Sequence, residues 1–313
     1  MKEDLSPALK HLSFSEIWIE GPDGSQNSLK NFGSELDTTL LHVFYTRFDE
    51  CIQISVLYKR HDFLWIGKIP PIERKGIQKD IHFGRHESAF DSFKLYSLRI
   101  LSKGIRILLP EKSLHFLSEV SSSQFIECDF SSAKRLQRIY GTDIQCPESK
   151  LLKVREGLTS LKEFTSKIFM PFFISSGTLL GWYRQCSVIP YTFDVDTATW
   201  SSYATEGTID QFIHNDVGLK LSYIYGLPTN GLQFALYTTS DLRVDLFFTY
   251  KEGRNLTYTG HESDKKRYYR YIYPVFDLCS AELLGLKVLV PCSPIDILRA
   301  GMRLIELDDR CSR

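Results

Sequence analysis

The 313-residue chain is long for one domain and natural for two, and a hydrophobic content of 43% can supply each with a core. Lys and Arg together number 38, as do Asp and Glu, so the formal net charge is zero and gives no bulk basic signal for nucleic acid. No apolar run is long enough for a transmembrane helix, and residues 1–20 lack the apolar core of a signal peptide.

Residues 1–145 are predicted to form a smaller mixed α/β module. The predicted strands cover 40–45, 52–58, 63–69, 105–109 and 125–128, and the predicted helices cover 110–120 and 131–140. The histidines of this module are dispersed, and we interpret each as a surface or satisfied core residue. They are His11, His42, His61, His82, His86 and His115. The module either holds an acceptor or a partner enzyme, or only supports the second module.

A polar segment with Gly, Thr, Asp and Pro at 141–148 separates this module from a second one, predicted over 146–313. Apolar residues at helical spacing predict a helix over 151–169 that packs on a sheet. They are Leu152, Val154, Leu158, Leu161, Phe164 and Ile168. A further helix is expected at 208–215, followed by strands at 219–225, 232–238 and 242–250 that form a meander.

Residues 175–200 are the part of the second module that indicates chemistry. An apolar strand over 172–174 leads into Ser175-Ser176-Gly177, and a short helix is predicted over 178–185 with Thr178 as a candidate N-cap. If residues 194–199 form a strand, its period of two directs Asp194 and Asp196 to one face. The intervening valine then faces a core.

A helix N-terminus beside two carboxylates is typical of a metal–phosphate site. The free N–H groups and the dipole of the helix attract phosphate, so Ser176, Gly177 and Thr178 are predicted to cradle it. Asp194 and Asp196 offer the hard oxygen ligands that Mg²⁺ prefers. The alternative is that both aspartates are solvated loop residues, since short motifs match often by chance.

Asp245 is a candidate third carboxylate, because a charged group in so apolar a strand is costly unless it pairs or binds metal. The alternative is a salt bridge to Arg243 on the same face. For the phosphates, Arg184 is the preferred cationic contact, since it lies in the motif helix. The basic segment 260–270, with Lys266, is a second candidate contact for the phosphates. The alternative is that its charges are only solvated.

The segment from Gly177 to Asp196 resembles the motif of the LicD family, which belongs to the nucleotidyltransferase-fold superfamily. The pattern is Gly-Thr-Leu-Leu-Gly, an Arg three residues on, Ile-Pro-aromatic and Asp-x-Asp, with a third acidic residue on a later strand. Within the family, the chain is most similar to the fukutin-type branch, through residues 182–186, 188–191, 278–279 and 287–292. The resemblance covers roughly 150–298 and implies an α/β (α+β) fold, a nucleotidyltransferase-like mixed sheet with flanking helices.

The resemblance implies a transferase that moves ribitol 5-phosphate from CDP-ribitol to a glycan hydroxyl, as on O-mannosyl glycans of the dystroglycan type, and releases CMP. Mg²⁺ or Mn²⁺ is then expected on Asp194 and Asp196. Asp245 either completes the metal site or takes the proton of the attacking hydroxyl. Glycosyltransferase partners and a place in the Golgi lumen or secretory pathway are implied too. Family members usually carry an N-terminal anchor, so this chain either lacks the anchor or is an incomplete gene product.

Two other functions stay open. One is a catalytically silent relative that binds a glycosyltransferase or a glycan as a scaffold, and the other is a nucleotidyltransferase acting on a sugar phosphate. Many bacterial family members have acidic residues where Thr192 and Phe193 stand, and Thr197-Ala198 replaces an aliphatic residue and glycine. Neither departure removes a carboxylate of the predicted site.

The seven cysteines form no Cys-x-x-Cys pair, so we find neither a zinc signature nor a dense disulfide framework. The resemblance implies that Cys186, Cys279 and Cys292 approach one another, and buried free cysteines are an equal alternative. Asn255-Leu256-Thr257 is an N-glycosylation sequon, which has meaning only if the chain enters the secretory pathway.

Overall fold

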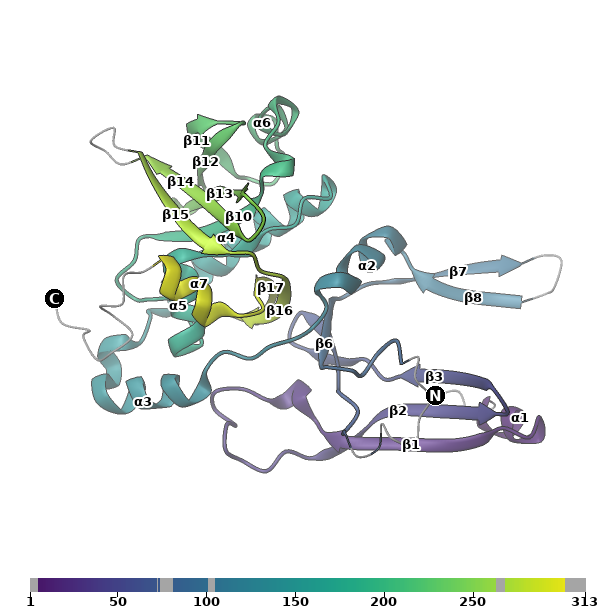
Figure 1. The fold of residues 1–313 in the computed structure, drawn as a ribbon. Helices are drawn as coiled ribbons and strands as arrows, with labels where there is room; N and C mark the ends of the chain where they lie inside the picture. The colour runs from purple at the N-terminus through teal and green to yellow at the C-terminus, as the bar shows by residue number, and fades with distance from the viewer. Residues whose placement is uncertain (1–4, 72, 74–80, 101–104, 263–267, 302–313) are drawn as a thin grey trace. The chain divides into compact units, whose positions relative to one another are not determined.

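The computed structural model describes residues 5–71, 73, 81–100, 105–262 and 268–301 (Figure 1). The chain divides into two compact units, Met1–Ile126 and Glu127–Arg313. This division lies nearer the N-terminus than the sequence-based boundary at 145/146. The predicted helix over 131–140 therefore belongs to the second unit.

The first unit is built mainly from antiparallel strands. Its elements are α1 (Leu5–His11), β1 (Ser15–Pro22), β2 (Thr38–Arg47), β3 (Glu50–Ser55), β4 (Tyr58–Arg60), β5 (Phe63–Ile66), β6 (Ser88–Asp91), β7 (Leu95–Ile100), β8 (Ile105–Pro110) and α2 (Ser113–Glu119). Strands β1-β2-β3 form one sheet, β4-β5-β6 another, and β7-β8 a hairpin. Its mixed α/β character is as predicted.

The strand predicted over 125–128 is wrong. Gln124 makes an isolated bridge to Ser88, and the Phe125 N–H donates to the Glu87 carbonyl at 2.7 Å, but the pairing goes no further. The apolar pattern there reflects the packing of Phe125 into a core cluster with Phe63 and its neighbours. A single buried side chain can therefore imitate a short strand in sequence.

His42 has the satisfied core position that sequence analysis gave to the histidines of this module. Its side chain is fully buried on β2. Its Nε2 hydrogen-bonds the Gly67 carbonyl at 2.9 Å, and its Nδ1 hydrogen-bonds the Ser55 Oγ at 3.0 Å. Burial lowers the pKa of His42, which keeps the ring neutral.

The second unit is a mixed sheet with helices around it, as predicted. Its elements are α3 (Phe130–Tyr140), α4 (Glu148–Lys167), β9 (Phe173–Ile174), α5 (Ser176–Gln185), β10 (Asp194–Trp200), α6 (Glu206–Ile213), β11 (Lys220–Leu227), β12 (Asn230–Tyr237), β13 (Arg243–Glu252), β14 (Leu256–Glu262), β15 (Tyr268–Pro274), β16 (Leu278–Leu283), β17 (Leu286–Pro291) and α7 (Pro294–Gly301). The predicted meander is confirmed as β11, β12 and β13, which pair antiparallel.

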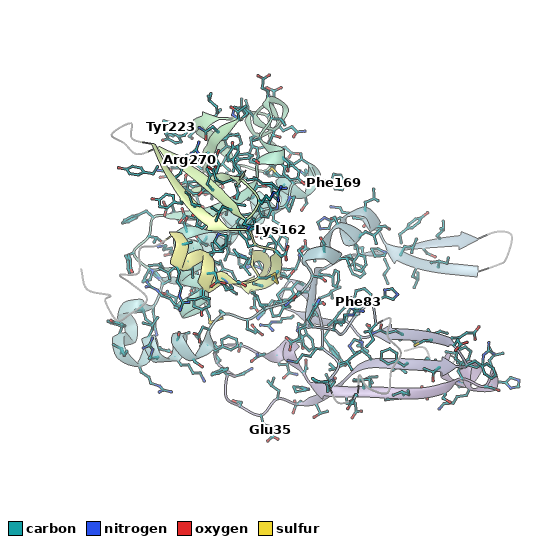
Figure 2. The ribbon with its side chains drawn as sticks, in the orientation of Figure 1. Glu35, Phe83, Lys162, Phe169, Tyr223 and Arg270 are labelled. Atoms are coloured by element: carbon teal, nitrogen blue, oxygen red, sulfur yellow. A yellow bond between two sulfur atoms is a disulfide. The ribbon has the colours of Figure 1, made fainter. Side chains whose placement is uncertain are left out.

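The main sheet has the strand order β11-β12-β13-β10-β9, and β14 joins β13 to β15. Strands β10 and β13 are parallel, and the other pairs are antiparallel. Figure 1 shows the long β14–β15 hairpin beside α7, drawn in yellow. The guanidinium of Arg270 lies over the Tyr258 ring at 4.4 Å, and Tyr223 is exposed on β11; Figure 2 labels Arg270 and Tyr223.

Helix α4 covers one face of the sheet. A Cβ at Gly157 would lie 3.2 Å from side-chain carbons of Leu242, Thr238 and Val244, so the helix backbone comes close to β13 here. Val244 and Val195 point to this face and are fully buried. The predicted apolar stripe of the helix is mostly buried, but Leu152 is 61% exposed. Since successive strand residues alternate, Asp194, Asp196 and Asp245 must point to the opposite face.

Helix α3 belongs to the second unit because it is tied to α5. A disulfide joins Cys128 to Cys186, and the Asp129 N–H donates to the Tyr183 carbonyl at 2.9 Å. The side chain of Asp129 caps α3 by accepting from the Ser132 N–H. A second disulfide, Cys279–Cys292, joins the ends of the β16–β17 hairpin. The implied approach of Cys279 to Cys292 is thus confirmed, whereas Cys186 bonds elsewhere.

Candidate active site

The three predicted carboxylates lie together on one face of the main sheet. Oxygen atoms of Asp194, Asp196 and Asp245 are all within 4.8 Å of one another. Asp196 and Asp245 are direct partners in the parallel pair of β10 and β13, and Asp194 is one strand period earlier. Asp245 is buried and the other two are partly buried. This acidic triad is therefore preorganised by strand register and not by flexible loops.

The start of α5 holds Asp196 in place. The Gly177 N–H donates to the Asp196 Oδ2 at 2.9 Å, and the Asp196 N–H donates to the Thr178 Oγ1 at 2.8 Å. A Cβ at position 177 would lie only 3.1 Å from the same carboxylate oxygen, so a side chain here would crowd Asp196 and glycine avoids this contact. The helix begins at Ser176 with Ser175 as its N-cap, so the N-cap predicted at Thr178 is wrong. Thr178 binds the neighbouring strand instead.

Ser176 adopts a left-handed backbone conformation, with φ of 44°, at the first residue of α5. Non-glycine residues rarely adopt this conformation, and they do so most often at functional sites. The turn brings Ser176 and the first N–H groups of the helix to the acidic triad. Gly177 and Thr178 thus contact Asp196 directly after Ser176, and the binding of phosphate by the three residues stays a prediction.

The acidic triad is electrostatically strained. Burial, followed by the negative charges of Asp194 and Asp245, raises the pKa of Asp196 from 3.8 to about 7. Hydrogen bonds from the backbone of Gly177 and Thr178 act in the other direction. The charged form is thus disfavoured unless a cation is near.

Asp245 also forms the ion pair that sequence analysis gave as its alternative role. The Arg243 Nε donates to the Asp245 Oδ1 at 2.9 Å, and the two residues are on one face of β13. Arg243 is the direct strand partner of Asp194, so its guanidinium lies at the edge of the acidic triad. The ion pair and the triad therefore share Asp245.

Lys150 is a residue of this site that sequence analysis missed. It lies in the first turn of α4, and its Nζ donates to the carbonyls of Ile189, Pro190 and Thr192, the first two at 3.0 Å. Burial lowers the pKa of Lys150, while the negative charge of Asp194 acts to raise it. The ammonium thus fixes the loop that enters β10. No local motif could have signalled it, because its partners are distant in sequence.

Arg184, one of the predicted phosphate contacts, is not assembled with the acidic triad. Arg184 lies near the C-terminal end of α5, about 12 Å along the axis from Ser176 at 1.5 Å per residue. Its Nη2 donates to the Tyr191 hydroxyl at 3.1 Å. Lys266 lies outside the described residues. Phosphate binding by either residue stays a prediction.

The residues of the acidic triad fit a divalent cation. They offer several carboxylate oxygens within 4.8 Å, which is the hard donor set that Mg²⁺ and Mn²⁺ take. Burial is the main cause of the raised pKa of Asp196, and a cation there would offset both it and the repulsion from Asp194 and Asp245. The fit rests on this donor chemistry and on the electrostatic strain.

The chain matches two family models. Residues 4–153 match the model described as Fukutin N-terminal. Residues 170–293 match the model described as LicD/FKTN/FKRP, nucleotidyltransferase domain. The second match contains the acidic triad, the start of α5 and the β16–β17 hairpin.

Curated relatives agree with these models. The chain is 30% identical over 299 residues to "Ribitol-5-phosphate transferase FKTN" of Homo sapiens, and 32% identical over 299 residues to the protein of the same name in Mus musculus. Each alignment covers 93% of this chain and 63% of the relative, so the chain spans under two thirds of the length of these proteins. An "Uncharacterized protein W02B3.4" of Caenorhabditis elegans is 33% identical over 129 residues, 39% of this chain and 33% of that protein. The chain belongs to the LicD/FKTN/FKRP family, with a region that matches the fukutin N-terminal model before the region that matches the nucleotidyltransferase domain.

Proposed function

We propose that this protein transfers ribitol 5-phosphate from CDP-ribitol to a glycan hydroxyl and releases CMP. The acceptor is proposed to be an O-mannosyl glycan of the dystroglycan type. The observation that supports this most strongly is the convergence of Asp194, Asp196 and Asp245 on the start of α5, inside the segment that matches the LicD/FKTN/FKRP domain. The relatives that share this segment are named ribitol-5-phosphate transferases.

Mg²⁺, or Mn²⁺ in its place, is the proposed metal, with Asp194, Asp196 and Asp245 as the residues that would hold it. Such an ion neutralises charge on a diphosphate and on the departing nucleoside monophosphate. Gly177 and Thr178 then have a positioning role, because their hydrogen bonds fix the carboxylate and the strand of Asp196. Their predicted direct contact with phosphate is part of this proposal, together with that of Ser176.

The proposed reaction forms one bond to the acceptor and breaks one bond of the donor diphosphate. The acceptor hydroxyl oxygen forms a bond to the phosphorus that bears ribitol, and the bond from this phosphorus to the bridging oxygen breaks. The bridging oxygen leaves with the electron pair as part of CMP. The hydroxyl proton passes to a base, for which Asp245 is the candidate if it does not serve the metal alone. Arg243, beside Asp245, could balance charge on the diphosphate.

The secretory pathway, and the Golgi lumen within it, is the proposed location. Disulfides form and persist in oxidising compartments, and Cys128–Cys186 and Cys279–Cys292 are both bonded. Asn255 of the sequon is exposed in the turn before β14. None of the helices within the described residues is long and apolar enough to cross a membrane. Glycosyltransferase partners belong to the same proposal.

A silent scaffold is the second candidate, and the ion pair between Arg243 and Asp245 is the observation that favours it. An ion pair with an arginine can stabilise a buried carboxylate in the absence of a metal. Thermal denaturation with CDP separates the two functions. The transferase should be stabilised by CDP in Mg²⁺, by about 2.7 kcal/mol at a hundred times the dissociation constant, and much less in EDTA. The absence of any such stabilisation would favour the scaffold.

A further inference from the structure

A cavity of about 230 Å³ lies in the second unit, beside the acidic triad. It is enclosed by the main sheet and β15, by the start of α5 and by α7. Its lining includes Ser175, Phe247, Thr249, Tyr271, Tyr273 and Phe276. At Gly301, the end of α7, a Cβ would lie 2.9 Å from the Tyr273 ring, so the helix closes tightly against this wall.

Strand periodicity places the cavity next to the acidic triad on the same face of the sheet. Ala198 and Phe247 line it, and each is two residues after a triad carboxylate, Asp196 and Asp245 respectively. Residues two apart on a strand share a face and are separated by about 7 Å. A molecule whose phosphates lie at the acidic triad can therefore extend directly into the cavity. The small side chain of Ala198 leaves room at the entrance.

Two hydroxyl groups of the cavity wall have no partner within the part of the chain that the structure describes. They are the Thr249 Oγ1 and the Ser175 Oγ, and both atoms are buried. Thr249 as a whole is only 2% exposed. Buried polar side-chain atoms are nearly always hydrogen-bonded, and an unpaired one destabilises the fold. Both residues line the cavity, so rotation of either side chain about its Cα–Cβ bond would offer the hydroxyl to a ligand there.

The rest of the lining selects the chemistry of that ligand. Phe247, Tyr271, Tyr273 and Phe276 present aromatic rings, and the remaining wall combines aliphatic side chains with the small hydroxyl side chains of serine and threonine. A polyol would lose the hydration of several hydroxyls there and recover few hydrogen bonds. A planar base has faces that stack on aromatic rings and only a few polar atoms, all along its edge.

We propose that this cavity binds the nucleobase of the nucleoside diphosphate donor, with the hydroxyls of Thr249 and Ser175 hydrogen-bonded to the polar edge of the base. The inference rests on the proposed function, in which the donor is a cytidine diphosphate compound. It adds that the cytidine, and not the alditol, occupies the aromatic cavity. The alditol then extends from the acidic triad in the other direction, toward the acceptor.

Thr249→Val tests the assignment, because valine has the shape of threonine without the hydroxyl. Binding of CMP and, separately, of ribitol 5-phosphate is measured in Mg²⁺ by calorimetry, and the melting temperature is measured without ligand. We expect CMP affinity to fall about tenfold, which is ~1.4 kcal/mol. The unliganded variant should melt at the same or a higher temperature, since an unpaired buried hydroxyl is removed. Thr249→Ser should keep CMP affinity within a few-fold.

Thr257→Val is the matched control. The Thr257 Oγ1 is also buried and without a partner within the described residues, but Thr257 does not line the cavity. This variant should change the melting temperature in the same direction and leave CMP affinity unchanged. All variants are produced without N-glycans, because Thr257 belongs to the sequon at Asn255.

Each outcome has a distinct meaning. Weaker CMP binding in Thr249→Val alone supports the nucleobase cavity. Unchanged CMP binding, or a loss confined to ribitol 5-phosphate, overturns it while the proposed function stands. An equal loss in Thr257→Val also overturns it, because the effect would not be local. A wild-type protein that binds no CMP in Mg²⁺ overturns both the cavity assignment and the proposed function.

Discussion

Asp196 and Asp245 lie directly opposite each other in the parallel pair of β10 and β13. Parallel pairing aligns the strands in one direction, so the register fixes which carboxylates meet. A slip of one residue would turn Asp245 toward the core and bring Val244 to the site. Burial of residues on the opposite face, such as Val195, therefore maintains the register and with it the geometry of the acidic triad.

Asp194→Asn and Asp196→Asn should each lower the transfer rate by more than tenfold, which is about 1.4 kcal/mol of barrier or more. The amide keeps the size of the side chain and removes the charge that a divalent cation needs. The measurement is the initial rate with CDP-ribitol and Mg²⁺, with far-ultraviolet circular dichroism to verify folding. Asp210→Asn on the exposed surface of α6 is a control that should retain full rate. A triad variant that keeps more than a tenth of the rate would exclude that residue as a ligand.

The metal-free protein should become less stable as pH rises from about 4 to about 7. The folded-state pKa of Asp196 is raised from 3.8 to about 7, so the folded state binds more protons than the unfolded state in this window. Stability falls with rising pH wherever the folded state holds the extra proton, and the loss is complete once pH exceeds the folded pKa. A shift of about three pKa units corresponds to a few kcal/mol.

Chemical denaturation at a series of pH values in EDTA measures this slope. Asp196→Asn should flatten it, because the amide does not titrate. Saturating Mg²⁺ should restore stability mainly near neutral pH, where the carboxylates are charged. If Asp196→Asn shows the same dependence of stability on pH as the wild type, the effect belongs to another group.

Paired substitutions can show whether Asp245 serves mainly in the ion pair with Arg243 or as a ligand of the metal. Asp245→Leu should abolish transfer but change the melting temperature of the metal-free protein by only a few degrees. The change removes the repulsion of Asp245 on Asp196, and Arg243 is partly exposed and can hydrate. Differential scanning calorimetry of both single variants and of Arg243→Met/Asp245→Leu gives the coupling energy. A coupling of several kcal/mol, with a large loss of stability, would mean that the ion pair is the main role of Asp245.

Lys150→Met should slow transfer and destabilise the second unit by about 1–3 kcal/mol. The change leaves the carbonyls of Ile189, Pro190 and Thr192 without their shared charged donor. Lys150→Arg should recover only part of the rate, because a planar fork cannot direct one nitrogen at all of these oxygens. Rates and melting temperatures are compared with those of Lys153→Met, an exposed lysine of the same helix. Wild-type rates in Lys150→Met would show that the loop needs no such support.

The acidic triad could be predicted because its signals are local. A period of two indicated the shared face of Asp194 and Asp196, and the apolar surroundings of Asp245 marked it as a costly charge. The register and the parallel direction of β10 and β13 were not predicted, and only the structure gives them. The N-cap was misplaced at Thr178 because its hydroxyl binds the amide of Asp196, a contact across the fold that helix propensity does not describe.

The parts that could not be predicted depend on distant segments. Cys186 pairs with Cys128, which lies before α3, and disulfide connectivity depends on tertiary distances. Lys150 acts on a loop that follows another strand and helix. The cavity around Thr249 combines residues from β9 to α7, so no short window of sequence contains it. The same long-range packing explains why α3 joined the second unit.

The most direct test is to identify which phosphorus of the donor is attacked. The purified protein is incubated with CDP-ribitol, Mg²⁺ and an O-mannosyl glycan acceptor. The acceptor is then analysed by mass spectrometry and the nucleotide by chromatography, with EDTA as the control. The account predicts that CMP is released in step with a gain of one ribitol phosphate on the acceptor, and that EDTA stops both. A cytidylylated acceptor would contradict it and indicate nucleotidyl transfer, and the absence of any turnover of the donor would contradict it in favour of the silent scaffold.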